Sequence, residues 1–91
     1  MGIKIYKTNS AAGAVAVEIS DSDWRLMEPL LRPLFLQWGD FFGPYADGQL
    51  NDHHIQQIYI AIEDEKKISD KVRMFFAPSR QHSRGYYLFG D

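Results

Sequence analysis

The residue types best suited to chemistry lie together at Asp52, His53 and His54. A histidine beside a carboxylate can transfer protons or bind a metal ion. Adjacent side chains on a helix point about 100° apart, however, so the two imidazoles would not readily share one metal ion. The next carboxylate, Glu63, lies two turns or more farther along. We therefore interpret both histidines as first-turn residues beside a helix cap. A small-ligand-binding or enzymatic domain using His53 and His54 is kept as the alternative function.

The segment between the two predicted helices has part of the pattern of a calcium-binding loop. Asp47 and Gly48 fit the fifth and sixth positions of such a loop. Its first, third and twelfth positions would then be Gly43, Tyr45 and His54, which lack the oxygen ligands that calcium needs. A plain turn between helices is the better interpretation, and we expect no metal or other cofactor.

Alternating basic residues near the C-terminus form a second candidate site, at Arg80, His82 and Arg84. Basic side chains beside aromatic rings can bind a phosphate, an acidic partner or single-stranded nucleic acid. The simpler interpretation is a solvated hairpin loop, so nucleic-acid contact through this loop is the third functional hypothesis. The aromatic residues that flank the loop are Phe75, Phe76, Tyr86 and Tyr87.

Composition excludes several classes of function. The chain has 91 residues and a net charge of −2, whereas nucleic-acid binders usually carry a strongly basic total or stripe. It has no cysteine, and no serine lies in a glycine-flanked nucleophile elbow. The first ten residues have no apolar run long enough for a signal peptide, and no apolar run in the chain is long enough to cross a membrane, so we expect neither feature. We expect a non-enzymatic, cytoplasmic protein that forms one domain over residues 1–91 and has no membrane partner.

The longest apolar pattern runs from Asp21 to Phe42 and predicts a helix over about 21–42. Ser20 is a possible N-cap, with Asp23 three residues later as in a capping box. Proline interrupts a helix interior, so Pro29 and Pro33 predict a short turn over 21–28 followed by a main helix. One continuous but kinked helix is the alternative. The large apolar residues of this stripe are Trp24, Met27, Leu31, Leu34, Phe35 and Trp38.

Shorter patterns predict the remaining elements of an α+β fold. Alternation over 3–8 and 14–19 predicts an N-terminal β-hairpin. A helix is expected over about 51–67, capped by Asn51 or Asp52, although 55–62 would also fit a strand. Residues 72–77 and 85–89 are expected to form a C-terminal β-hairpin that completes an antiparallel sheet. A short helix from Ser69-Asp70 through Phe76, ended by Pro78, is the alternative for the first of these two segments.

The aromatic content, 14% of the residues, suggests that some rings remain on the surface. Tyr, Trp, Phe and Arg are enriched at the centres of protein interfaces. Because the sequence shows no recognisable set of catalytic residues, the most economical hypothesis is a stand-alone protein-binding module. Such a module could be a regulator, an inhibitor or immunity-type protein, or an accessory subunit. Its partner would be another protein or a second copy in a homodimer, and nucleic acid is disfavoured. The candidate partner-binding residues are Arg80, His82, Arg84, Tyr86, Phe42 and Tyr45.

Overall fold

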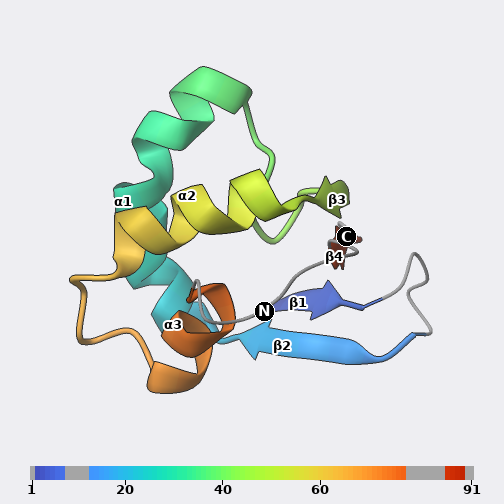
Figure 1. The fold of residues 1–91 in the computed structure, drawn as a ribbon, viewed down its shortest axis with the longest axis horizontal. Helices are drawn as coiled ribbons and strands as arrows, with labels where there is room; N and C mark the ends of the chain where they lie inside the picture. The colour runs from blue at the N-terminus through green and yellow to red at the C-terminus, as the bar shows by residue number, and fades with distance from the viewer. Residues whose placement is uncertain (1, 8–12, 78–85, 90–91) are drawn as a thin grey trace.

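The computed structural model describes residues 2–7, 13–77 and 86–89, which form an α+β fold as predicted (Figure 1). Four strands make one antiparallel sheet in the order β2-β1-β4-β3, and the helices lie on one side of it. The elements in chain order are β1 (Ile3–Tyr6), β2 (Val15–Ile19), α1 (Asp21–Trp38), β3 (Gly48–Leu50), α2 (Asp52–Ile62), α3 (Asp70–Phe76) and β4 (Tyr86–Leu88).

The N-terminal hairpin is confirmed, because β1 and β2 pair in antiparallel register. Ile3 and Ile5 are buried toward the helices, whereas Lys4 between them is exposed. This alternation follows from the two-residue period of a strand. Lys4 therefore lies on the open face of the sheet, directly opposite Glu18 of β2.

Helix α1 is continuous through both prolines, so the expected division near residue 28 is wrong. The alternative was one continuous but kinked helix, and its continuity is confirmed. Pro29 and Pro33 are exposed, on the side of the helix opposite the buried Met27. Each proline leaves the carbonyl four residues earlier without its helical donor. Those carbonyls belong to the exposed residues Arg25 and Pro29, where water can satisfy them.

Local interactions determine where α1 begins and where it ends. Its N-cap is Ser20, whose hydroxyl accepts a hydrogen bond from the Asp23 amide at 3.1 Å. The helix ends at Trp38 instead of Phe42, because Gly39 takes a positive φ of 77° that favours glycine. The Gly39 amide then donates to the Phe35 carbonyl at 2.7 Å, which satisfies one of the last carbonyls of the helix.

Helix α2 confirms the helical interpretation of residues 55–62 and ends at Ile62, earlier than residue 67. Asn51 is its N-cap and forms a capping box with His54. The Asn51 side chain accepts from the His54 amide at 2.9 Å, and the Asn51 amide donates to Nδ1 of His54 at 3.4 Å.

The C-terminal third differs from the expected hairpin. Residues 70–76 form helix α3, the alternative that began at Ser69-Asp70, and not a strand. Val72, Phe75 and Phe76 are buried, a spacing that fits one face of a helix. Strand β4 pairs instead with β1 and with β3. β3 lies in the segment that was predicted to be a plain turn between two helices. A three-residue strand is too short to show an alternation pattern, so β3 could not be predicted from the residue pattern.

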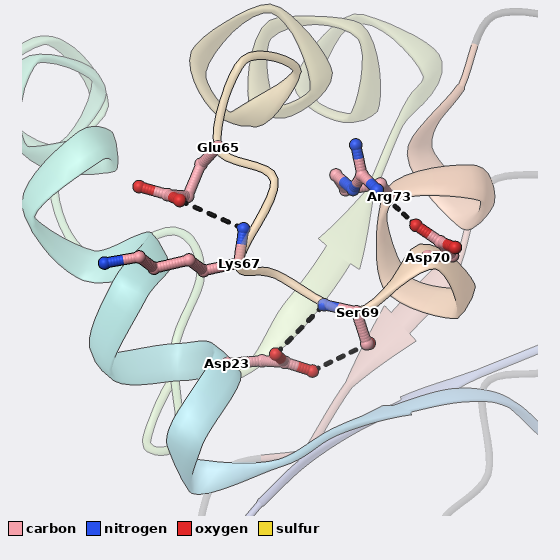
Figure 2. Close-up of polar contacts among 6 residues, drawn as sticks. All are labelled: Asp23, Glu65, Lys67, Ser69, Asp70 and Arg73. Carbon is pink, nitrogen blue, oxygen red and sulfur yellow. Dashed lines mark hydrogen bonds and ion pairs between the residues drawn. The ribbon is translucent and has the colours of Figure 1, made fainter.

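One long-range polar contact fixes α1 against the start of α3 (Figure 2). The carboxylate of Asp23 accepts hydrogen bonds from the Ser69 amide at 3.2 Å and the Ser69 hydroxyl at 2.8 Å. Asp23 is 8% exposed, and no other charged residue among the described ones is buried. Its side chain therefore does not complete a capping box with Ser20, but joins two segments 46 residues apart.

The core lies between the sheet and the helices and is continuous from β2 to β4. Phe42 packs at its centre, with ring centroids 5.8 Å from Trp24 and 6.0 Å from Phe76. Across the described ranges, no helix combines the length and apolar character needed to span a membrane.

Candidate partner-binding groove

A tight turn over residues 43–46 presents the most exposed aromatic side chain of the described residues. The Ala46 amide donates to the Gly43 carbonyl at 3.2 Å, which closes the turn. Pro44 and Tyr45 occupy its two central positions, and proline favours the first of them. The Tyr45 side chain is 76% exposed. Tyr45 is thus the one candidate among the described residues that the structure places on an open surface.

The turn is anchored on both sides of Tyr45. Phe42 is 2% exposed and Ala46 is 8% exposed, so both are core residues. Gly43 has a φ of 150°, and a Cβ there would lie 3.4 Å from Cζ2 of Trp24. The backbone that carries Tyr45 is therefore held by packing. Phe42, which the sequence suggested for partner binding, serves this core and offers no free surface.

A groove of about 390 Å³ lies beside this turn. One wall is the beginning of β1, another is the end of β4, and the turn forms a third. Tyr45 lies at its border, because both of its neighbours in the chain line the groove. The lining residues are Gly2, Ile3, Lys4, Tyr6, Glu18, Gly43, Pro44, Ala46, Leu88 and Phe89.

At the β1 wall of the groove, β1 lies next to β4. The Lys7 amide donates to the Ala14 carbonyl beyond β2, so odd-numbered residues of β1 direct their main-chain groups toward β2. Lys4 and Tyr6 consequently direct theirs toward β4. Tyr6 lies opposite Tyr87, but that is the single register pair between the two strands. Continued along the chain, this antiparallel register brings Leu88 beside Ile5 and Phe89 beside Lys4.

The groove has a mixed polar and aromatic rim. Lys4 and Glu18 form a cross-strand pair of opposite charge on its open side. The rings of Tyr6 and Phe89 meet edge to face, with centroids 5.2 Å apart. Such a rim offers an ammonium, a carboxylate and two aromatic rings to a ligand.

Of the remaining candidate partner-binding residues, one lies at the edge of the core and three lie outside the described residues. Tyr86 is half-buried, and its ring centroid lies 4.9 Å from that of Phe75. Arg80, His82 and Arg84 lie outside the described residues, so the nucleic-acid hypothesis that rests on them stays untested. Sequence reasoning did not select Lys4, Tyr6 or Phe89, because the groove that they line is formed by segments far apart in the sequence.

The histidine pair takes a structural position at the start of α2. His54 uses Nδ1 in the capping box, and its ring packs against Trp38 and Phe41 at centroid distances of 5.2 and 5.1 Å. Burial, and secondarily the charge of His53, lowers the pKa of His54 below its usual 6.5. His53 is exposed, with its ring 5.3 Å from Trp38. This geometry supports the interpretation of both residues as first-turn neighbours of a helix cap.

Neither histidine is among the residues that line this groove. Among residues 2–7, 13–77 and 86–89, no group of three or more His, Asp or Glu side chains could hold a metal ion. A second groove of about 220 Å³ lies between α2 and α3, where Arg73 pairs with Asp70 (Figure 2). Nε of Arg73 is buried there without a hydrogen-bond partner. Glu63 and Asp70 give this second groove a net negative charge.

The chain matches no protein-family model, no curated protein and no solved structure. Function must therefore be inferred from the geometry of the site.

Proposed function

We propose that this chain is a small protein-binding module that acts by contact with another protein, or with a second copy, without catalysis. A regulator, an inhibitor or immunity-type protein, or an accessory subunit would act in this way, and we place that action in the cytoplasm. The observation that carries the proposal is Tyr45: a tyrosine 76% exposed, on an anchored turn, at the border of a groove.

The position of Tyr45 suits a residue that dominates a protein interface. Tyrosine supplies a large apolar ring with a polar tip, and it is enriched among the few residues that carry most of the binding energy. Because Phe42 and Ala46 are buried, the turn is ordered before any partner arrives. Binding then costs little loop entropy, which is the usual penalty for contacts made by flexible segments.

The direct test is capture of a partner from lysate of the native host by three forms of the protein: wild type, Tyr45→Ser and Leu36→Ser. Leu36 is the matched control, because it is 90% exposed but lies on α1 and lines neither groove. We expect Tyr45→Ser to weaken the captured complex by at least about 2 kcal/mol, or roughly 30-fold in Kd. Leu36→Ser should retain the partner.

Thermal melts of the same proteins separate binding from folding. Both substitutions lie on the surface, so each should change stability by no more than about 0.5 kcal/mol. Native mass of the eluate distinguishes a different protein from a second copy. Absence of any stoichiometric partner, together with a monomeric mass, contradicts the proposal. Equal binding by wild type and Tyr45→Ser would mean that Tyr45 does not contribute to the interface, and the proposed function would lose its main support.

A further inference from the structure

We propose that two copies of the chain pack the open faces of their sheets together around a two-fold axis, with Lys4 of each copy against Glu18 of the other. This inference rests on the proposed function and names a second copy as the partner. The open face is the side of the sheet that the helices do not cover (Figure 1).

One row of side chains crosses the open face over all four strands. Tyr6 of β1 points to this face, because its neighbour Ile5 is buried under the helices. Tyr6 lies opposite Val15 of β2 and Tyr87 of β4, and Tyr87 lies opposite Gln49 of β3. A sheet face that meets water is usually polar. This row carries two tyrosines and a valine that is 43% exposed, which is typical of a face that another surface covers.

The next row on the open face carries opposite charges. Lys4 lies opposite Glu18, and both side chains are exposed. Phe89 follows beside Lys4, and its ring meets that of Tyr6 edge to face at 5.2 Å. A partner surface of one charge would meet a like charge at Lys4 or at Glu18. The row is therefore complementary to a surface that also carries one charge of each sign.

A two-fold axis makes this pair of charges complementary to itself. In such an interface, if residue i contacts residue j of the other copy, then j also contacts i. Lys4 of each copy then meets Glu18 of the other, and the four charges alternate in sign. A network of this kind contributes more than a single pair on the surface. The adjacent rings of Tyr6 and Phe89 supply apolar area that leaves water when the two sheets pack about 10 Å apart.

The open face also contains the rim of the groove beside Tyr45. Lys4, Tyr6, Glu18 and Phe89 all line that groove, so Tyr45 at its border lies at the edge of the proposed interface. A small domain buries a smaller fraction of its surface than a large one, and self-association is a common way to bury more.

The experiment is sedimentation equilibrium of the full chain at concentrations up to about 1 mM, which detects even weak association. We expect the wild type to dimerise and its melting temperature to rise with protein concentration. Lys4→Glu and Glu18→Lys should each weaken the dimer at least about tenfold, because each brings like charges together at two places. Lys66→Glu is the matched control: Lys66 is exposed, lies outside the sheet and the groove, and its substitution changes the net charge equally. It should dimerise like the wild type.

Mixing the two charge variants tests the pairing directly. An equimolar mixture of Lys4→Glu and Glu18→Lys should form mixed dimers within about threefold of the wild-type affinity, because both contacts between copies again join opposite charges. The cross-strand pair within each chain stays like-charged in the mixture. Recovery can therefore come only from contact between the two chains.

The double variant, with Lys4→Glu and Glu18→Lys together, keeps opposite charges within each chain. It should form dimers with itself but not with ¹⁵N-labelled wild type, since both contacts of a mixed dimer would join like charges. Native mass spectrometry of the mixture distinguishes the species. If a single variant fails to fold, this double variant decides the question.

Three results would overturn the proposal. The first is a wild type that stays monomeric at the highest concentration. The second is a dimer that neither single variant weakens, which would place the interface on another surface. The third is a failure of the charge pairing, shown by single variants that do not associate when mixed or by a double variant that mixes freely with the wild type.

The two proposals can fail separately. If the wild type is monomeric but captures a different protein that Tyr45→Ser loses, the sheet-face dimer is wrong and the binding module stands. If the wild type neither dimerises nor captures a partner, the proposed function fails as well.

Discussion

At the scale of single residues, Asp23 combines two roles that usually belong to different side chains. Its amide donates to Ser20 and so helps to start α1. Its carboxylate accepts two hydrogen bonds from Ser69 at the start of α3. On burial the carboxylate of Asp23 loses hydrogen bonds to water, and the amide and hydroxyl of Ser69 replace them. These two hydrogen bonds explain how a carboxylate can be only 8% exposed.

Replacing Asp23 by alanine should therefore cost about 1–3 kcal/mol of the free energy of unfolding, because both donors of Ser69 lose their acceptor. Urea denaturation measures the loss, with Ser22→Ala as the control on an exposed neighbour. The Asp23→Ala, Ser69→Ala double mutant should lose less than the sum of the two single losses. Strict additivity would mean that the contact contributes nothing.

At the scale of elements, the predictable parts of the fold are those with a long or regular pattern. The β-hairpin and the two longer helices each bury residues at the expected period, as Ile5 and Ile58 illustrate. Residues 72–77 were ambiguous because Val72 and Phe76 fit a strand or a helix, and only packing against β2 and α2 decides between them. The groove was beyond prediction, because its walls come from the beginning of β1, the turn over residues 43–46 and the end of β4, which are far apart in the sequence.

The N-terminus of α2 supplies a prediction about pH. The pKa of His54 is lowered in the folded state, so the unfolded chain binds a proton more readily as the pH falls through 6.5. The corresponding stability is fully present above pH 6.5 and is lost as the pH falls through the lower pKa of the folded state. Protonation also removes Nδ1 as the acceptor for the Asn51 amide.

His54→Gln is the matched variant, because glutamine at this position can complete a capping box and does not titrate. We expect the free energy of unfolding of the wild type to decrease more than that of His54→Gln when the pH is lowered from 7.5 to 5.5. Urea denaturation at several pH values measures the difference. Parallel pH profiles for the two proteins would show that His54 does not contribute to the acid sensitivity.

At the scale of the whole molecule, a single core joins elements from both ends of the chain. The Cα radius of gyration is 12.0 Å, about that of a compact chain of this length. β4 lies between β1 and β3, so the C-terminal strand joins the N-terminal hairpin to β3. Phe42 contacts rings from α1 and α3 at the same time. Loss of this one side chain should therefore weaken the whole fold rather than one part of it.

Phe42→Ala should reduce the free energy of unfolding by about 3–5 kcal/mol, the usual cost of removing a buried phenylalanine ring. Circular dichroism of the aromatic bands and of the backbone should report the same lowered midpoint, because the core is shared. Tyr45→Ala, three residues away and 76% exposed, should change stability by no more than about 0.5 kcal/mol. The opposite ranking would place Phe42 on the surface and Tyr45 in the core, and would remove the anchored turn on which the proposed binding function depends.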